Sequence, residues 1–257
     1  MLLERFLISR HKLIMSKKLF YLLMMLITIS SCKQLQMVKY ETKSTKISDS
    51  SLSIDSSTSN FLKLFRDSLA IEMNSKIAYN KNTLTKSTGE STLGNFLADA
   101  LLSETKKIDN VKADFAVINL GGIRLPQLPA GDVTIGKVYE LMPFDNAVVI
   151  LDMNAEDINS FFNYKAAIGG WPIAGASYRI RDGRAINISI NGEPLQSNQV
   201  YKLAISDYLA DGGDKLDMLK KLQRFNTGVL LRDMFISFFK LKKVIEVELD
   251  GRIKNEN

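Results

Sequence analysis

The chain has 257 residues, a formal net charge of +6 from 34 basic and 28 acidic side chains, and an ordinary apolar content. Residues 1–31 hold five basic and one acidic side chain, so the remainder carries only +2. Binding to nucleic acid would need a basic stripe on the folded domain, and the sequence shows none. The one histidine is His11 and the one cysteine is Cys32. The sequence after Cys32 therefore excludes a Ser-His-Asp triad, a histidine general base and a zinc site with imidazole ligands.

The N-terminal segment has the pattern of an export signal. "MSKKLFYLLMMLITISSC", residues 15–32, has two lysines, an apolar run too short to span a bilayer, and small residues before Cys32. Residues 29–32 resemble the lipobox of bacterial lipoproteins. We therefore predict a signal peptide over residues 1–31, lipidation at Cys32, and a chain anchored outside the cytoplasm to a bacterial membrane, in the periplasm or at the cell surface. The alternatives are a buried cysteine near a short apolar helix and, for the start of translation, Met15.

A serine- and threonine-rich stretch follows. These two residue types fill 11 of the 18 positions in residues 42–59, and bulky apolar side chains are scarce. Such a segment buries too little surface to offset the entropy of ordering. We predict a disordered tether over residues 32–60, an ordered domain over 61–250 and a short tail over 251–257.

The ordered domain is predicted to begin with two helices. Apolar side chains recur every fourth residue from Phe61 to Ile77, which indicates one helix face. A second helix is predicted over residues 93–105. "DFAVIN", residues 114–119, has the composition of a buried strand and leads into the glycine pair Gly121-Gly122.

The second half of the domain is predicted to alternate strands and helices. Residues 147–153 form a buried strand, and Asn154 caps the helix that follows. Residues 176–195 form a meander whose turns are Asp182-Gly183 and Asn191-Gly192. A strand over 200–206, a helix over 229–239 and a strand over 243–249 complete the chain. Crossover and hairpin connections together favour an α+β (mixed α/β) fold, in which helices flank a mixed sheet.

Four segments stand apart from this framework. They are "STLGNFLADAL" (91–101), "NLGGIRLPQLPAGDVTIGKVYELMPFDN" (119–146), "IAGASYRI" (173–180) and "SDYLADGGD" (206–214). In this order and spacing they resemble the C-terminal domain of the 5′-nucleotidase and UDP-sugar hydrolase family. Full-length members carry a metallophosphoesterase domain with two metal ions, and their C-terminal domain holds the nucleoside. The resemblance implies that this chain is the substrate-binding half alone, a lipoprotein without a metal centre of its own.

The resemblance also assigns roles to individual residues. It places Arg124 against the anionic part of a substrate, which suits a planar guanidinium. Phe144 and Tyr208 would stack on the two faces of a base, Asn146 would meet the base edge, and Asp214 would hold ribose hydroxyls. Gly175 would line the sugar pocket, and Gly121 and Gly122 would bring backbone close to the ligand.

Purely structural roles remain as alternatives for four of these residues. Arg124 could be a surface arginine in a salt bridge, Phe144 and Tyr208 could be core side chains, and Asp214 could be a turn aspartate. The sequence also departs from the family upstream of "STLGN". Full-length enzymes often carry arginines there, whereas this chain offers Lys81 and Lys86, which supply charge without bidentate geometry.

Three functions follow from these patterns. The first is the nucleoside- or nucleotide-binding half of a split 5′-nucleotidase, with a separate metallophosphoesterase chain supplying the divalent metals and with no cofactor in this chain. The second is a lipid-anchored protein that scavenges nucleosides without catalysis. The third is a degenerate domain kept for protein contacts. Whether the chain takes part in hydrolysis is left open by the sequence.

Overall fold

The computed structural model describes residues 21, 44, 55–108 and 112–256. The chain divides into two units, Met1–Ile54 and Asp55–Asn257, and the fold described below belongs to the second. The predicted signal peptide, Cys32 and the tether up to residue 54 lie outside the described residues, apart from Tyr21 and Ser44. In the described part of the chain, no helix is both long enough and apolar enough to cross a membrane.

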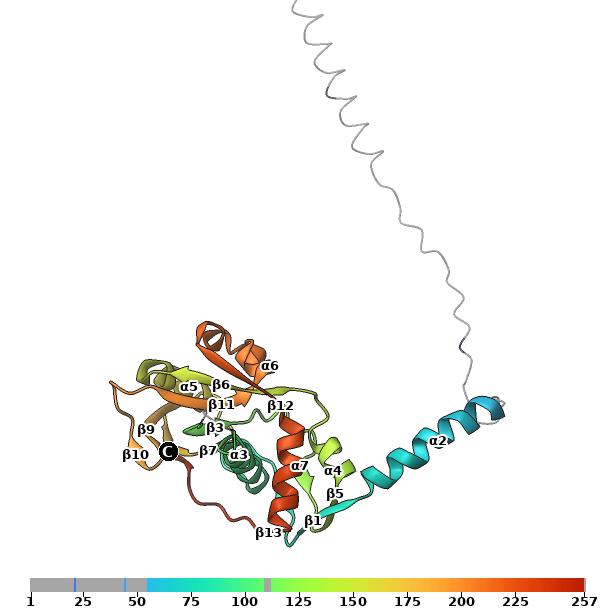
Figure 1. Cartoon of the computed structure of the whole chain (residues 1–257). Coiled ribbons are helices and arrows are strands. Elements are labelled where there is room, and N and C mark those ends of the chain that lie inside the picture. The colour runs from blue at the N-terminus through green and yellow to red at the C-terminus, as the bar shows by residue number, and fades with distance from the viewer. Residues whose placement is uncertain (1–20, 22–43, 45–54, 109–111, 257) are drawn as a thin grey trace, which may run out of the picture. The chain divides into compact units, whose positions relative to one another are not determined.

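The second unit is a mixed α/β domain, as predicted (Figure 1). Its helices are α2 (Ser56–Met73), α3 (Thr92–Thr105), α4 (Ile135–Leu141), α5 (Ala155–Ala166), α6 (Asp207–Ala210) and α7 (Leu231–Lys242), with 3-10 turns η2 (Gly213–Lys215) and η3 (Asp217–Lys221). Its strands are β1 (Lys76–Asn80), β2 (Leu84–Thr85), β3 (Phe115–Val117), β4 (Gln127–Leu128), β5 (Gly131–Thr134), β6 (Ala147–Met153), β7 (Ile173–Ala174), β8 (Ala176–Arg181), β9 (Arg184–Ile190), β10 (Glu193–Pro194), β11 (Tyr201–Ser206), β12 (Arg224–Leu230), β13 (Val244–Ile245) and β14 (Ile253–Asn255).

A five-stranded sheet in the order β12-β6-β11-β3-β7 forms the centre of the domain. Strand β11 runs parallel to β3 and antiparallel to β6. Both faces of this sheet are covered, which explains why "AVVIL" in β6 is apolar without alternation. Val148 and Ile150 face a core that includes α3 and α7, whereas Val149 and Leu151 face a core that includes α5 and β8. Phe96 of α3 packs against Phe239 of α7, with ring centroids 4.9 Å apart.

The capping residue and the turn dipeptides predicted the elements from α5 to β10 correctly. Asn154 caps α5 in a capping box with Asp157, and the strands β8, β9 and β10 follow as a meander. Asp182 and Gly183 have φ values of 50° and 70°, which match the left-handed turn that joins two antiparallel strands. The four-stranded sheet β10-β9-β8-β14 results from this meander and the C-terminal strand.

Several boundaries differ from the predictions. Helix α2 begins at Ser56, inside the predicted tether, and its apolar row is exposed, with Phe61 62% and Phe65 56% accessible. Ile77 leaves the helical repeat and lies in β1. The predicted strand over 243–249 is reduced to β13. Residues 253–255, predicted as tail, form β14 and pair with β8.

Candidate nucleoside-binding pocket

One edge of the five-stranded sheet carries a cavity of about 300 Å³. Because β3 and β11 are parallel, the segments that follow them emerge at the same edge. Because β6 is antiparallel to β11, β6 begins at this edge, and the segment that precedes β6 therefore lies there too. The topology therefore brings together three segments that are far apart in the chain. The lining residues come from these segments: Asn119, Gly121, Gly122, Arg124, Phe144, Asn146, Tyr208 and Asp214. Tyr208 belongs to α6 and Asp214 to η2.

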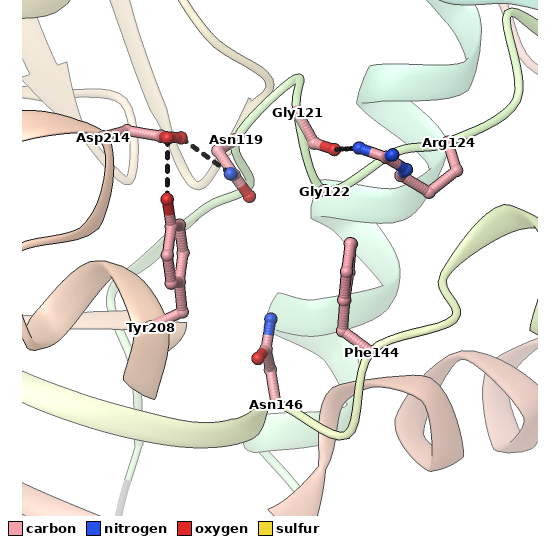
Figure 2. A pocket seen from close by; sticks show the side chains of 8 residues that line it. All are labelled: Asn119, Gly121, Gly122, Arg124, Phe144, Asn146, Tyr208 and Asp214. Atoms are coloured by element: carbon pink, nitrogen blue, oxygen red, sulfur yellow. Dashed lines mark hydrogen bonds between the residues drawn. The ribbon is translucent and has the colours of Figure 1, made fainter. Parts of the chain in front are cut away.

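The two aromatic rings face each other across this cavity (Figure 2). Phe144 is 40% exposed and Tyr208 is 45% exposed, so neither ring is a core side chain. Gly213 packs against the tyrosine, because a Cβ at this glycine would lie 2.5 Å from the tyrosine ring. The exposed faces of the rings, rather than their edges, are turned toward the gap. A flat aromatic ligand fits this arrangement.

Asp214 is held in place by two hydrogen bonds to other residues that line the pocket (Figure 2). Asn119 Nδ2 donates to one carboxylate oxygen at 2.7 Å, and Tyr208 Oη donates to the other at 3.0 Å. The aspartate itself adopts a left-handed conformation with φ of 51°. Its carboxylate remains solvent-exposed and can accept further hydrogen bonds from ligand hydroxyl groups.

Asn119 was not predicted as a site residue. It is 9% exposed and stands between β3 and the glycine pair. Gly122 leaves room for this side chain, because a Cβ there would lie 2.6 Å from the asparagine Oδ1. The signal in the sequence was the asparagine that opens "NLGGIR", where a buried strand gives way to a turn. Its partner, Asp214, is 95 residues away, and no local pattern connects the two.

Arg124 lies at the rim of the pocket. Its Nη1 donates to the backbone oxygen of Gly121 at 3.3 Å, and its guanidinium carbon lies 5.5 Å from the centroid of the Phe144 ring. The side chain is exposed and makes no carboxylate ion pair within the described residues, so these residues give no support to the salt-bridge alternative. A guanidinium in this position can bind an anionic group carried by a ligand in the pocket.

The two lysines upstream have other partners. Lys81 forms an ion pair with Glu246 at 2.6 Å. Lys86 Nζ donates to the backbone oxygen of Ile123 at 2.7 Å and thus supports the segment that follows the glycine pair. Within the described residues, Arg124 is the one cationic side chain that lines the cavity.

Gly175 does not line the cavity, and this prediction is corrected by the structure. It connects β7 to β8 with φ of 72°. A Cβ at this position would lie 2.3 Å from the backbone oxygen of Asp114. The glycine therefore allows a close crossing of two backbone segments, which is a structural requirement rather than a contact with ligand.

A buried lysine near the pocket was also not predicted. Lys165 is 1% exposed, and its Nζ has no hydrogen-bond partner in the described part of the chain. The ammonium lies 3.2 Å from the centroid of the Trp171 ring and 4.6 Å from that of Tyr164. Burial lowers the pKa of Lys165 to about 8, and the negative charge of Asp214 opposes this shift. In the described residues, no three histidine, cysteine or acidic side chains gather as a metal site would need.

The fold and the pocket together define a mixed α/β domain with a ligand site at one edge of its central sheet. The sequence profile of the family described as "5′-nucleotidase, C-terminal domain" matches residues 70–221. The match covers more than half of the chain, so this protein belongs to that family.

Curated relatives and a solved structure agree with this assignment. A 5′-nucleotidase of Vibrio cholerae is 28% identical over 204 residues, which cover 75% of this chain and 36% of the relative. A 5′-nucleotidase of Vibrio parahaemolyticus is 31% identical over 167 residues, covering 62% of this chain and 29% of the relative. The crystal structure of a 5′-nucleotidase precursor from Thermus thermophilus superposes with a TM-score of 0.68 at 28% identity, covering 79% of this chain and 44% of that one. The chain thus spans less than half the length of each of these proteins.

Proposed function

We propose that this protein is the nucleoside- or nucleotide-binding half of a split 5′-nucleotidase. The observation that carries the proposal is the convergence of two facing rings, a fixed carboxylate and a guanidinium on one cavity. Stacking on aromatic side chains contributes on the order of 1–3 kcal/mol per base and tolerates different bases. In the bound complex Phe144 and Tyr208 hold the base, Asp214 accepts hydrogen bonds from ribose hydroxyls, and Arg124 binds the phosphate.

In this proposal the hydrolytic chemistry belongs to a separately encoded metallophosphoesterase. That partner supplies the divalent metals, and this chain orients the nucleotide for attack at phosphorus. Positioning of a bound reactant can account for a large part of a barrier, so the division of labour is chemically sound. After Cys32 the sequence contains no histidine and no cysteine, so a metal centre in this part of the chain would have to use carboxylate and amide ligands.

Isothermal titration of the purified chain with adenosine and with AMP tests the binding part of the proposal. We expect AMP to bind more tightly, and Arg124→Ala to weaken AMP binding by about 10-fold to 100-fold while leaving adenosine nearly unchanged, because hydrogen bonds to charged groups are the stronger ones. Arg184→Ala removes an exposed arginine from β9 and serves as the matched control. Failure of both ligands to bind the wild-type chain would refute the proposal and leave a domain kept for protein contacts.

The hydrolytic part needs its own assay. The purified chain should release little phosphate from AMP even with added divalent metal, and addition of the metallophosphoesterase should raise the rate above that of either protein alone. Robust hydrolysis by this chain alone would contradict the split arrangement.

One observation favours nucleoside scavenging as a second candidate. Lys81 and Lys86 are occupied by Glu246 and by backbone oxygens. Of the residues that the structure describes, Arg124 is then the one cationic side chain in the cavity wall that can face a phosphate. A scavenger would bind adenosine as tightly as AMP, and Arg124→Ala would change neither affinity. The same titrations therefore separate the two functions.

We further propose that Cys32 carries a lipid that anchors the chain to a bacterial membrane, outside the cytoplasm. The support is the signal-like pattern of residues 15–32 and the polar stretch that follows it. Labelling of cells with a radioactive fatty acid should mark the wild-type protein and not the Cys32→Ser variant. Equal labelling of both would place the lipid elsewhere.

A further inference from the structure

The start of α7 contacts the wall of the pocket that carries Phe144. Arg232, the second residue of this helix, is 6% exposed. Its Nη1 donates to the backbone oxygen of Phe144 at 3.3 Å, and its Nη2 pairs with the carboxylate of Asp145. The backbone nitrogen of Leu231 donates to the backbone oxygen of Asn146 at 2.9 Å. Two consecutive residues of α7 thus hold three consecutive residues of the pocket wall.

The guanidinium also contacts an aromatic ring. Its central carbon lies 4.1 Å from the centroid of the Tyr139 ring, in α4. A planar cation stacked on an aromatic face and bonded through two of its nitrogens has little rotational freedom. The loop between α4 and β6 is therefore clamped to α7 at a defined distance.

The contribution of Arg232 to the stability of the fold is a weak explanation for an arginine at this position. Its Nε finds no hydrogen-bond acceptor among the described residues, and its partner Asp145 is 76% exposed at the side chain. Buried ion pairs are often no more stabilising than apolar side chains of similar volume. The contacts of this arginine have a second effect, because they fix the place of the segment that it binds.

Placement matters because stacking is sensitive to distance. A base held between two rings needs van der Waals contact on both faces, and a gap of about 0.5–1 Å forfeits a quarter to a half of the attraction on that face. Phe144 precedes β6 and lies outside every strand, so its position depends on contacts such as those from α7. Figure 2 shows its ring on the side of the gap opposite Tyr208.

We propose that Arg232 is a positioning residue that sets the Phe144 ring at the spacing a nucleobase requires. It acts through the backbone oxygen of Phe144 and through Asp145, and it does not touch the ligand itself. This inference rests on the proposed nucleoside-binding function and identifies a residue that tunes it.

A double-mutant cycle tests the inference. Arg232→Met keeps an unbranched side chain and removes the contacts of the guanidinium with Phe144 and Asp145, while the backbone hydrogen bond of Leu231 remains. We expect it to weaken adenosine binding about fivefold to tenfold, less than the loss of a whole stacking partner in Phe144→Ala. In the Phe144→Ala background Arg232→Met should cause no further loss, because the ring through which it acts is gone. Arg232→Lys should recover part of the affinity, since one ammonium can reach one of the two acceptors.

The matched control is Arg181→Met. Arg181 also pairs with a carboxylate, that of Glu256 at 2.7 Å, but it lies in β8 and does not line the cavity. Its substitution should leave adenosine affinity unchanged. If Arg232→Met weakens binding equally with and without Phe144, or leaves affinity unchanged and only lowers thermal stability, the inference is wrong.

A ligand-free measurement separates this inference from the proposed function. Phe144→Trp adds a second tryptophan to the one in the chain, Trp171, which is buried. Nanosecond anisotropy and acrylamide quenching then report on the ring at position 144. Arg232→Met should increase both its mobility and its quenching. An unchanged signal would overturn the clamp even if adenosine binds, whereas a mobile ring with no nucleoside binding would uphold the clamp and refute the proposed function.

Discussion

Replacement of Lys165 by methionine should stabilise the domain near neutral pH. The lysine is 1% exposed, and its ammonium has no hydrogen-bond partner among the described residues. Burial lowers the pKa of Lys165 to about 8, against 10.5 for an exposed lysine. Below pH 8 the folded protein carries a charge that the unfolded chain accommodates more easily. The difference between the pKa of Lys165 in the folded protein and that of an exposed lysine corresponds to about 3 kcal/mol of stability lost relative to high pH.

Part of that loss is offset by the aromatic surroundings. A desolvated ammonium over a ring gains about 0.5–2 kcal/mol, and the Trp171 ring lies 3.2 Å away. Methionine fills a similar volume and contacts aromatic rings favourably. We therefore expect Lys165→Met to raise the free energy of unfolding at pH 7 by about 1–2 kcal/mol.

The pH dependence is the sharper test. The pKa is lower in the folded state, so the unfolded chain binds the extra proton and wild-type stability rises as pH rises from about 8 toward 10. The free energy of unfolding of the wild type, measured with urea, should rise by about 2 kcal/mol from pH 7 to pH 9.5. Lys165→Met should show no such rise. The scan stops there because burial raises the pKa of Tyr178, and unfolded tyrosines ionise from about pH 10 and reverse the trend.

Lys240→Met removes an exposed lysine from α7 and is the matched control, which should follow the wild-type profile. Parallel profiles for wild type and Lys165→Met would refute the reasoning. A Lys165→Met protein that is less stable at pH 7 would do so as well, because it would mean that the ammonium is well compensated in the fold.

Three further outcomes are expected. Gly175→Ala should lower the free energy of unfolding by about 2–4 kcal/mol, because its φ of 72° and the Asp114 oxygen 2.3 Å from the new Cβ both oppose a side chain. Urea unfolding measures this change. A loss of adenosine affinity at unchanged stability would instead indicate that Gly175 contacts the ligand. Asn119→Ala should remove one of the two hydrogen bonds that hold the Asp214 carboxylate. We expect calorimetric titration to show a preference for adenosine over 2′-deoxyadenosine that is about twofold to tenfold smaller, which is the contribution of one hydrogen bond. An unchanged preference would mean that Asp214 does not recognise the ribose. Tyr208→Phe keeps the ring and loses the hydrogen bond to Asp214, so it should weaken adenosine binding by less than about tenfold, whereas Tyr208→Ala should weaken it by more; equal losses would count against stacking.

Local sequence determined much of the secondary structure. The helix α3, the strand β6, the capped helix α5 and the meander from β8 to β10 all follow from periodicity, capping residues and turn dipeptides. These signals act over a few residues, so neighbours in the sequence suffice to establish them. Strand β12 escaped prediction because it lies at the sheet edge and is mostly exposed, which leaves little apolar pattern. The resemblance of four segments to a known family brought seven of the eight lining residues into view.

The pocket itself was decided by the tertiary structure. Whether Phe144 and Tyr208 face one gap depends on the order and direction of β3, β11 and β6, which no local pattern encodes. The same holds for Asn119, whose partner Asp214 is 95 residues away, and for Arg232, which reaches Phe144 across 88 residues. The placement of Gly175 outside the cavity likewise follows from a backbone crossing. Residue types and short spacings report burial and turns, but the meeting of distant segments is set by how the whole sheet pairs and packs.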